Sequence, residues 1–314
     1  MTASLDLAPN EGFARTPGAS APLAKTRPFY WSVRRELWEN RAIYLAPLIA
    51  AGVVLFGVAL GHLHLLHVQA NQQQGFGSFD GGRTQIGLPP IIPYLIGAGP
   101  IVVTTLIVGV FYCLAALNAE RRDRSVLFWK SLPVSDLTTV LSKAVIPAIV
   151  LPVVALVVII ATQLAMLALD LASAAVGGQS VGTLLGQLPL GHVWLDLGYL
   201  LLVIGLWYAP VWGWLLLVSA WSKRMTFLWG VGPPLAVCVI ERMAFGTGFA
   251  WNVLKSRLAG GLADAFARPP ANTMVLPWPD PLGFLATPGL WIGLVVGAAC
   301  LGGAVWLRRR REPV

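Results

Sequence analysis

Long runs without a charged residue alternate with short polar segments along this chain. A membrane-spanning helix needs about 20 mainly apolar residues, and six of the runs approach or exceed that length. The runs are continuously apolar, whereas strands of a membrane barrel alternate polar and apolar positions over about ten residues. The pattern therefore predicts an all-α integral membrane protein. Six transmembrane helices are expected at about residues 43–66, 91–117, 143–169, 197–221, 225–245 and 286–307.

Composition agrees with this pattern. The chain has 314 residues, of which 56% are hydrophobic and 11% charged, and its mean hydropathy is +0.71. Soluble domains carry about 25% charged residues. An ordinary soluble domain is therefore excluded, and residues 42–314 are expected to form a single six-helix transmembrane domain.

The N-terminal region divides into two parts. Residues 1–27 contain few large apolar side chains and are expected to be a disordered cytoplasmic tail. In residues 28–41, apolar and charged positions alternate with helical spacing, which predicts a helix in the membrane interface. Its two sides are Phe29, Val33, Leu37 and Trp38, against Arg34, Arg35, Glu36, Glu39 and Asn40. The helix is either a simple anchor or an anchor that also contacts a cytoplasmic partner.

The basic residues predict the orientation. With both termini in the cytoplasm, only five of the 22 Lys and Arg fall outside, as the positive-inside rule requires. These five are Arg83, Arg242, Lys255, Arg257 and Arg268. Topology and anionic lipid headgroups then account for the net charge of +8, so no nucleic-acid partner is predicted.

Charged residues and histidines on the outer side are the first candidates for chemistry. Glu241 and Arg242 interrupt the fifth apolar run, and an ionisable residue within a span is a functional candidate, here for a substrate path. The alternative is that the helix ends there and both side chains reach headgroups or water. His62, His64 and His67 do not share one helix face, so no metal site is predicted.

Two further patterns concern packing. The pairs Gly57/Gly61 and Gly293/Gly297 have the spacing that lets membrane helices approach closely. In the long outer loop, residues 246–285, large apolar side chains recur every four residues, which predicts one or two short amphipathic helices on or dipping into the outer leaflet. They are Leu254, Leu258, Leu262 and Phe266.

Motifs of soluble enzymes are absent from the sequence. The dipeptide Gly-Lys never occurs, so the chain has no phosphate-binding P-loop and is not expected to hydrolyse ATP or bind a cofactor itself. HExxH does not occur, and no GxSxG or GxGxxG stands in the strand-turn-helix context that its chemistry needs. A membrane-embedded enzyme would need a convergent acid, base or metal set, and the sequence offers none.

The polar segment 118–142 between the second and third spans is predicted to be an ordered helix–turn–helix. Glu120 to Lys130 can continue the second span as a helix. Leu132-Pro133 should end that helix, because a residue before proline is pushed out of helical geometry. Ser135 or Asp136 can then cap the next helix.

The residues of this segment carry a resemblance to a family. Glu120-Arg121, Ser125, Leu127, Leu132-Pro133-Val134-Ser135 and Lys143 resemble the first cytoplasmic loop of ATP-binding cassette (ABC) permeases of the type-2 exporter class. The six spans, the interfacial helix and the long last outer loop are similar to that class too. The family pattern has Gly before the [ST] position, where this chain has Arg124.

This resemblance implies a function and partners. The chain would be a permease subunit of an ATP-driven exporter in the bacterial cytoplasmic (inner) membrane, moving an unidentified hydrophobic or amphipathic substrate. Two copies of a separate ATPase subunit would hold ATP and magnesium, and a second permease subunit, identical or different, would complete the dimer. The coupling contact would comprise Glu120, Arg121, Arg124, Ser125, Phe128, Trp129, Leu132, Pro133 and Ser135. The helix before the first span would add Arg34, Arg35, Glu36 and Trp38 as secondary contacts.

The alternative is an ATP-independent secondary carrier or channel. Such a protein would need polar side chains near the middle of several spans. The sequence offers Thr104, Thr105, Thr162 and Gln163.

Overall fold

The computed structural model of the chain describes residues 28–74, 91–122, 135–176, 182, 185–186, 188–260 and 279–310. Within these residues the protein is 92% helical and has no strand, which confirms the all-α prediction. The elements, in chain order, are α1 (Pro28–Glu39), α2 (Ala42–Gln74), α3 (Ile92–Ala116), α4 (Asn118–Arg122), α6 (Asp136–Val145), the π-helical turn η1 (Ile146–Val150), α7 (Leu151–Val176), α9 (Leu190–Trp207), α10 (Ala209–Trp221), α11 (Thr226–Phe245), α12 (Phe249–Lys255), the π-helical turn η2 (Ser256–Gly260), α14 (Pro281–Ala286) and α15 (Pro288–Arg310).

Six helical segments in the described part are long and apolar enough to cross a membrane. They are Ala42–Gly61, Ile92–Arg122, Asp136–Val176, Leu190–Trp207, Thr226–Phe245 and Pro288–Arg310. The chain is therefore a multi-pass membrane protein, as its hydropathy predicted. The stretch predicted as the fourth span, 197–221, covers only the second part of α9 and all of α10, which meet at Tyr208; the membrane-length helix here is α9, and it begins at Leu190.

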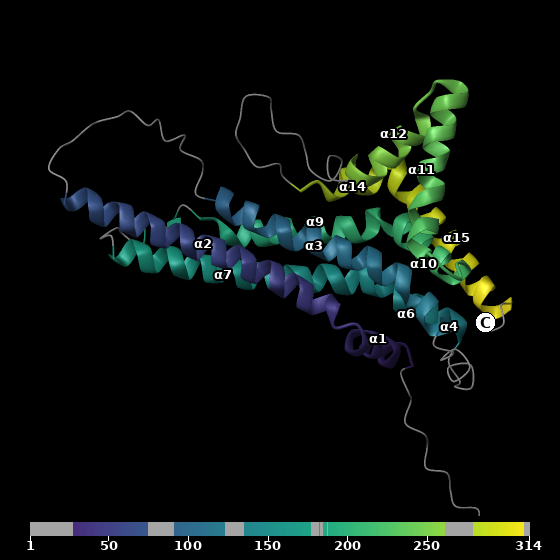
Figure 1. Ribbon diagram of the computed structural model, residues 1–314, viewed down its shortest axis with the longest axis horizontal. Coiled ribbons are helices and arrows are strands. Elements are labelled where there is room, and N and C mark those ends of the chain that lie inside the picture. Colours follow the sequence, from purple (N-terminus) through teal and green to yellow (C-terminus); the bar gives the residue numbers. More distant parts are fainter. Residues whose placement is uncertain are drawn as a thin grey trace, which may run out of the picture.

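The helices form an elongated bundle with one projecting hairpin (Figure 1). Helices α2, α3, α7 and α9 run side by side along the long axis, and α15 packs mainly on α10. Helix α1, α4, the start of α6 and the end of α15 meet at one end of the molecule, which we call the basal end. The first and last described helices therefore approach the same end of the bundle.

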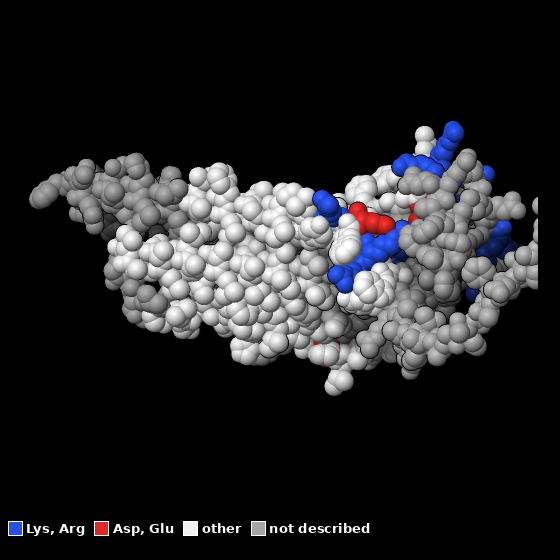
Figure 2. Space-filling model, turned by 90° about the horizontal axis from the view of Figure 1, so that it is seen from below, with Lys and Arg blue, Asp and Glu red and all other residues white. Residues whose placement is uncertain are grey.

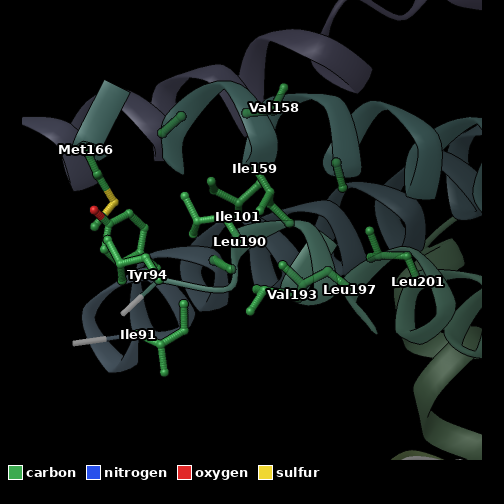
Figure 3. Packing of buried hydrophobic residues seen from close by; sticks show 14 of the residues in the cluster. Ile91, Tyr94, Ile101, Val158, Ile159, Met166, Leu190, Val193, Leu197 and Leu201 are labelled. Carbon is green, nitrogen blue, oxygen red and sulfur yellow. The ribbon is translucent and has the colours of Figure 1, made fainter. Parts of the chain in front are cut away.

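The largest apolar core lies between α3, α7 and α9 (Figure 3). Tyr94 and Ile101 from α3 meet Ile159 and Met166 from α7, while Leu197 from α9 closes the third side. Between membrane helices this kind of contact stabilises through close van der Waals packing, because lipid is as apolar as the side chains.

One of the two glycine pairs serves close helix packing. A Cβ on Gly297 would lie 2.9 Å from the Ala209 carbonyl oxygen, so α15 can approach α10 only without a side chain there. Gly57 and Gly61 have no atom of another element within 4 Å of a would-be Cβ. The pair in α15 is therefore used for packing within the described chain, and the pair in α2 is not.

The hairpin of α11 and α12 leans away from the bundle and packs weakly on it. Only 6% of the most apolar window of α11 is buried. Gly230 is its buried residue, and the Gly230 carbonyl accepts a hydrogen bond from the Trp214 indole at 2.9 Å. Beyond α11, α12 and η2 supply the short helical structure predicted for the outer loop up to residue 260, and Leu262 and Phe266 lie outside the described residues.

Candidate functional site

A network of buried charges ties four helices together at the basal end. Its central member is Lys143 on α6, whose Nζ lies 2.6 Å from Glu36 Oε1 and 3.1 Å from Glu120 Oε1. Glu36 comes from α1 and Glu120 from α4. The Lys143 ammonium on α6, which follows the segment 123–134, is thus paired with α1 and with α4, which precedes that segment.

Arg308 extends the network to the last span. Its Nη1 lies 2.7 Å from Glu120 Oε2, and its Nε lies 3.0 Å from Asp136 Oδ1. On the other side, the Tyr112 hydroxyl of α3 donates to Glu36 Oε2 at 2.8 Å. We call these six residues the basal network: Glu36, Tyr112, Glu120, Asp136, Lys143 and Arg308.

Four of the six residues of the basal network are buried, and Asp136 lies at its edge near the surface. The side chains of Lys143, Glu36, Glu120 and Arg308 are between 3% and 9% exposed. A buried ion is costly unless its charge and its hydrogen-bonding sites are matched. Both carboxylate oxygens of Glu36 and both of Glu120 have a partner at 3.1 Å or closer. The network therefore holds only in one arrangement of the four helices.

Local sequence signals place these side chains. Ser135 caps α6, and its Oγ accepts from the Thr138 backbone N–H at 3.1 Å, which confirms one of the two predicted caps. The cap fixes where α6 begins, so that Lys143 and Val140 both turn toward the bundle and are buried. Asp136, in the first turn, stays near the surface and meets Arg308.

A second polar contact fastens α4 to the end of α10. Between α3 and α4, the Ser219 hydroxyl accepts from the Leu117 and Asn118 backbone N–H groups at 3.1 and 3.0 Å. It donates in turn to the Leu114 carbonyl at 2.9 Å. Arg121 Nη2 donates to the carbonyls of Ser219 and Ser222 at 2.8 and 2.6 Å. The short helix that carries Glu120 is thus held from both sides.

Replacing Ser219 by Ala should loosen this junction. Ser219 is fully buried, so the change leaves two backbone N–H groups without an acceptor, and we expect a loss of about 2 kcal/mol of stability. Thermal unfolding in mild detergent measures the loss. The control is Ser173→Ala, since among the described residues Ser173 donates only to the Asp170 carbonyl within its own helix. Equal melting temperatures for the two variants would contradict the assignment.

Glu36 lies inside the bundle and not on the exposed side of α1. The sequence placed it on the charged side of the interfacial helix and as a contact for an ATPase subunit. It is instead only 4% exposed, because Lys143 offers it a charge partner inside the bundle. Glu120 also turns inward. Neither carboxylate is available on the surface of the described chain.

Val33 and Leu37 of α1 pack on the core, while its aromatic residues Phe29, Tyr30, Trp31 and Trp38 are exposed. The Arg34 guanidinium lies over the rings of Trp31 and Trp38, at 5.3 and 4.9 Å from their centroids, and Trp38 is 69% exposed. Arg35 pairs with Glu39. In the view of Figure 2, charged residues gather over this end while the middle of the bundle is uncharged. This surface is compatible with either reading of the interfacial helix.

Most of the predicted coupling residues belong to the segment 123–134. Arg121 and Ser135 take the structural roles given above. Six others lie outside the described residues: Arg124, Ser125, Phe128, Trp129, Leu132 and Pro133. The side chains of His62, His64 and His67 also lie outside the described part.

Glu241 and Arg242 end a helix. Glu241 accepts hydrogen bonds from the backbone N–H groups of Phe249 and Ala250 at 2.7 and 2.6 Å, and so caps α12. Arg242 Nη1 contacts the Gly246 carbonyl at 3.4 Å, just where α11 stops in a left-handed glycine. The two residues shape the turn between α11 and α12.

Fold and site together define the class of this protein. It is a multi-pass α-helical membrane protein in which buried ion pairs join the first and last described helices to the segment between the second and third spans. No protein-family model, curated protein sequence or solved structure matches the chain.

Proposed function

We propose that this protein is the membrane-spanning permease subunit of an ATP-driven ABC exporter of the type-2 class. The observation that carries the proposal is the basal network. It joins α1, α4, α6 and α15 at the end of the bundle where the segment 123–134 leaves α4 and enters α6. The residues that resemble the family's coupling loop lie in that segment and at its two ends. The excess of basic residues supports a cytoplasmic location for this end.

The basal network suits a part that transmits force. Closure of two ATPase subunits, with ATP and magnesium bound on them, would push on the segment 123–134. Shifting a two-state protein from 1:99 to 99:1 takes about 5.5 kcal/mol of differential binding. Four helices fastened by buried ion pairs move as one body, so the push reaches α3, α7 and α15 without being lost in bending.

A lateral cavity favours an amphipathic substrate. About 260 Å³ of space opens between α3–α4 and α11. Phe111 and Phe227, whose rings stack at 6.3 Å, line it together with the polar side chains Asn118, Arg122 and Thr226. Apolar walls with a few polar groups are typical of sites for small amphipathic molecules. The cavity adjoins α4 and would therefore change shape with the coupling segment.

A secondary carrier or channel is the second candidate, and polar residues buried inside spans favour it. Thr105, Thr162 and Gln163 are at most 5% exposed. Both threonines, however, donate to carbonyls of their own helices at 2.7 Å. Gln163 binds the Tyr94 carbonyl at 3.1 Å and the Trp194 indole at 2.8 Å. These polar groups already form hydrogen bonds inside the bundle, so they are poorly suited to bind an ion or a solute.

Affinity purification in mild detergent tests the proposal. We expect the tagged wild-type protein to bring down an ATPase subunit, identified by mass spectrometry. A Trp129→Ala/Pro133→Gly double variant in the coupling segment should lose it. The matched control is Lys223→Gln/Arg224→Gln in the exposed turn between α10 and α11, which should retain it. Purification of the wild type without any nucleotide-binding partner, in several detergents, would overturn the exporter and favour the carrier.

A further inference from the structure

Arg257 lies in the bundle far from the basal end, where the turn η2 folds back against α9 and α15. Its guanidinium carbon sits 4.5 Å from the centroid of the Trp207 ring. The Trp207 indole donates to the Arg257 carbonyl at 2.9 Å, and the Tyr208 hydroxyl donates to the Leu258 carbonyl at 2.6 Å. Side chains at the junction of α9 and α10 thus hold the backbone of the turn in place.

Glycine in α15 makes room for the guanidinium. A Cβ on Gly293 would lie 2.6 to 2.8 Å from the terminal atoms of Arg257. Arg257 Nη2 donates to the Gly289 carbonyl, also on α15. The guanidinium of Arg257 therefore packs between the Trp207 ring on one side and the backbone of α15 at Gly293 on the other.

This guanidinium lacks a counter-charge among the described residues. Its Nη1 is buried and has no hydrogen-bond acceptor there. Burial lowers the pKa of Arg257 from its ordinary value, but arginine stays protonated at neutral pH. A buried N–H group without an acceptor costs roughly 1–3 kcal/mol, and more when it is charged.

We propose that Arg257 binds an anionic phosphate group, with Nη1 as the donor that the described chain leaves unused. Guanidinium and phosphate form short, charge-assisted hydrogen bonds. The position, near the start of α15 and opposite the basal end, is where the headgroup of a lipid in that leaflet would lie. A lipid headgroup and a free phosphate ion share this chemistry, and the experiment separates them. The inference does not depend on the proposed exporter function.

The test uses the full-length chain in an uncharged detergent. Thermal unfolding is followed with added phosphatidylglycerol, with diacylglycerol of the same acyl chains, and with inorganic phosphate. We expect phosphatidylglycerol to raise the melting temperature of the wild type, and the rise to be smaller by roughly 2–4 °C in Arg257→Gln. Lys255→Gln, which removes an exposed charge two residues away, should keep the full rise. Diacylglycerol should give no such difference between the variants.

Gly293→Ala keeps the charge of Arg257 but displaces the guanidinium. The increase in melting temperature with phosphatidylglycerol should therefore be reduced as much in Gly293→Ala as in Arg257→Gln. Native mass spectrometry provides a second readout, in which Arg257→Gln is expected to retain one phosphatidylglycerol fewer than Lys255→Gln. An Arg257-dependent rise with inorganic phosphate alone would support the phosphate site but identify a free ion as its ligand. Equal rises and equal bound lipid in Arg257→Gln, Lys255→Gln and the wild type would overturn the proposal.

Discussion

Replacing Lys143 by Met should be among the most damaging single changes in this protein. The substitution nearly conserves volume but removes the only cation within reach of Glu36 among the described ion pairs, and one of the two that neutralise Glu120. Both carboxylates are buried, and breaking a buried pair by removing one partner typically costs 3–5 kcal/mol. We expect a loss of about 4 kcal/mol of stability, measured by tryptophan fluorescence during thermal unfolding in mild detergent.

Two comparisons show whether charge is the cause. Lys223→Met removes an exposed lysine on the α10–α11 turn and should change stability by less than about 0.5 kcal/mol. The double variant Glu36→Gln/Lys143→Met also removes the stranded carboxylate, so it should be more stable than Lys143→Met alone. A double variant that melts no higher than the single one would show that the packing of Lys143, and not its pairing with Glu36, stabilises the basal end.

The sequence predicted the helices well because their signal is local. Continuous apolar runs marked all six membrane-length helices, and Ser135 was visible as a cap because a cap depends only on its own turn. The break at Tyr208 was missed, because the apolar run continues through it without a charge; the available signal was Pro210, which lies in the first turn of α10. Hydropathy predicts which residues lie in the membrane, but it does not predict where a helix is interrupted by its packing on neighbouring helices.

The basal network could not be predicted in the same way. Glu36 and Lys143 are 107 positions apart, and Glu120 and Arg308 are 188 apart. Helical spacing within 28–41 put Glu36 among charged neighbours, so a solvent-facing side was the natural expectation. Which charges meet is decided by the arrangement of four helices. The available signal was weaker: Glu120, Lys143 and Arg308 all lie at the ends of apolar runs, where an unpaired charge would be costly.

A second large effect is expected from Gly205→Ala on α9. A Cβ at this position would lie 2.2 Å from the Ala148 carbonyl oxygen of η1, and a backbone atom cannot move aside as a side chain can. The sequence explains why that carbonyl is exposed to α9. Pro152 has no N–H to offer the carbonyl four residues before it, which is the one of Ala148, and the helix is π-helical at 146–150.

Gly191→Ala is the matched control, because it makes the same change near the start of the same helix, where a would-be Cβ has nothing within 4 Å. In helix interiors alanine is favoured over glycine by up to about 1 kcal/mol, so Gly191→Ala should be neutral or slightly stabilising. Gly205→Ala should instead lose roughly 3 kcal/mol, as overpacked sites do. Thermal unfolding of the two variants side by side measures the difference.

The turn η1 connects α6, which carries Lys143, to α7. A shift of α9 away from η1 should therefore also displace the basal network. If both variants were equally stable, α9 would not approach η1 as closely as described. Helix α9 would then move independently of η1.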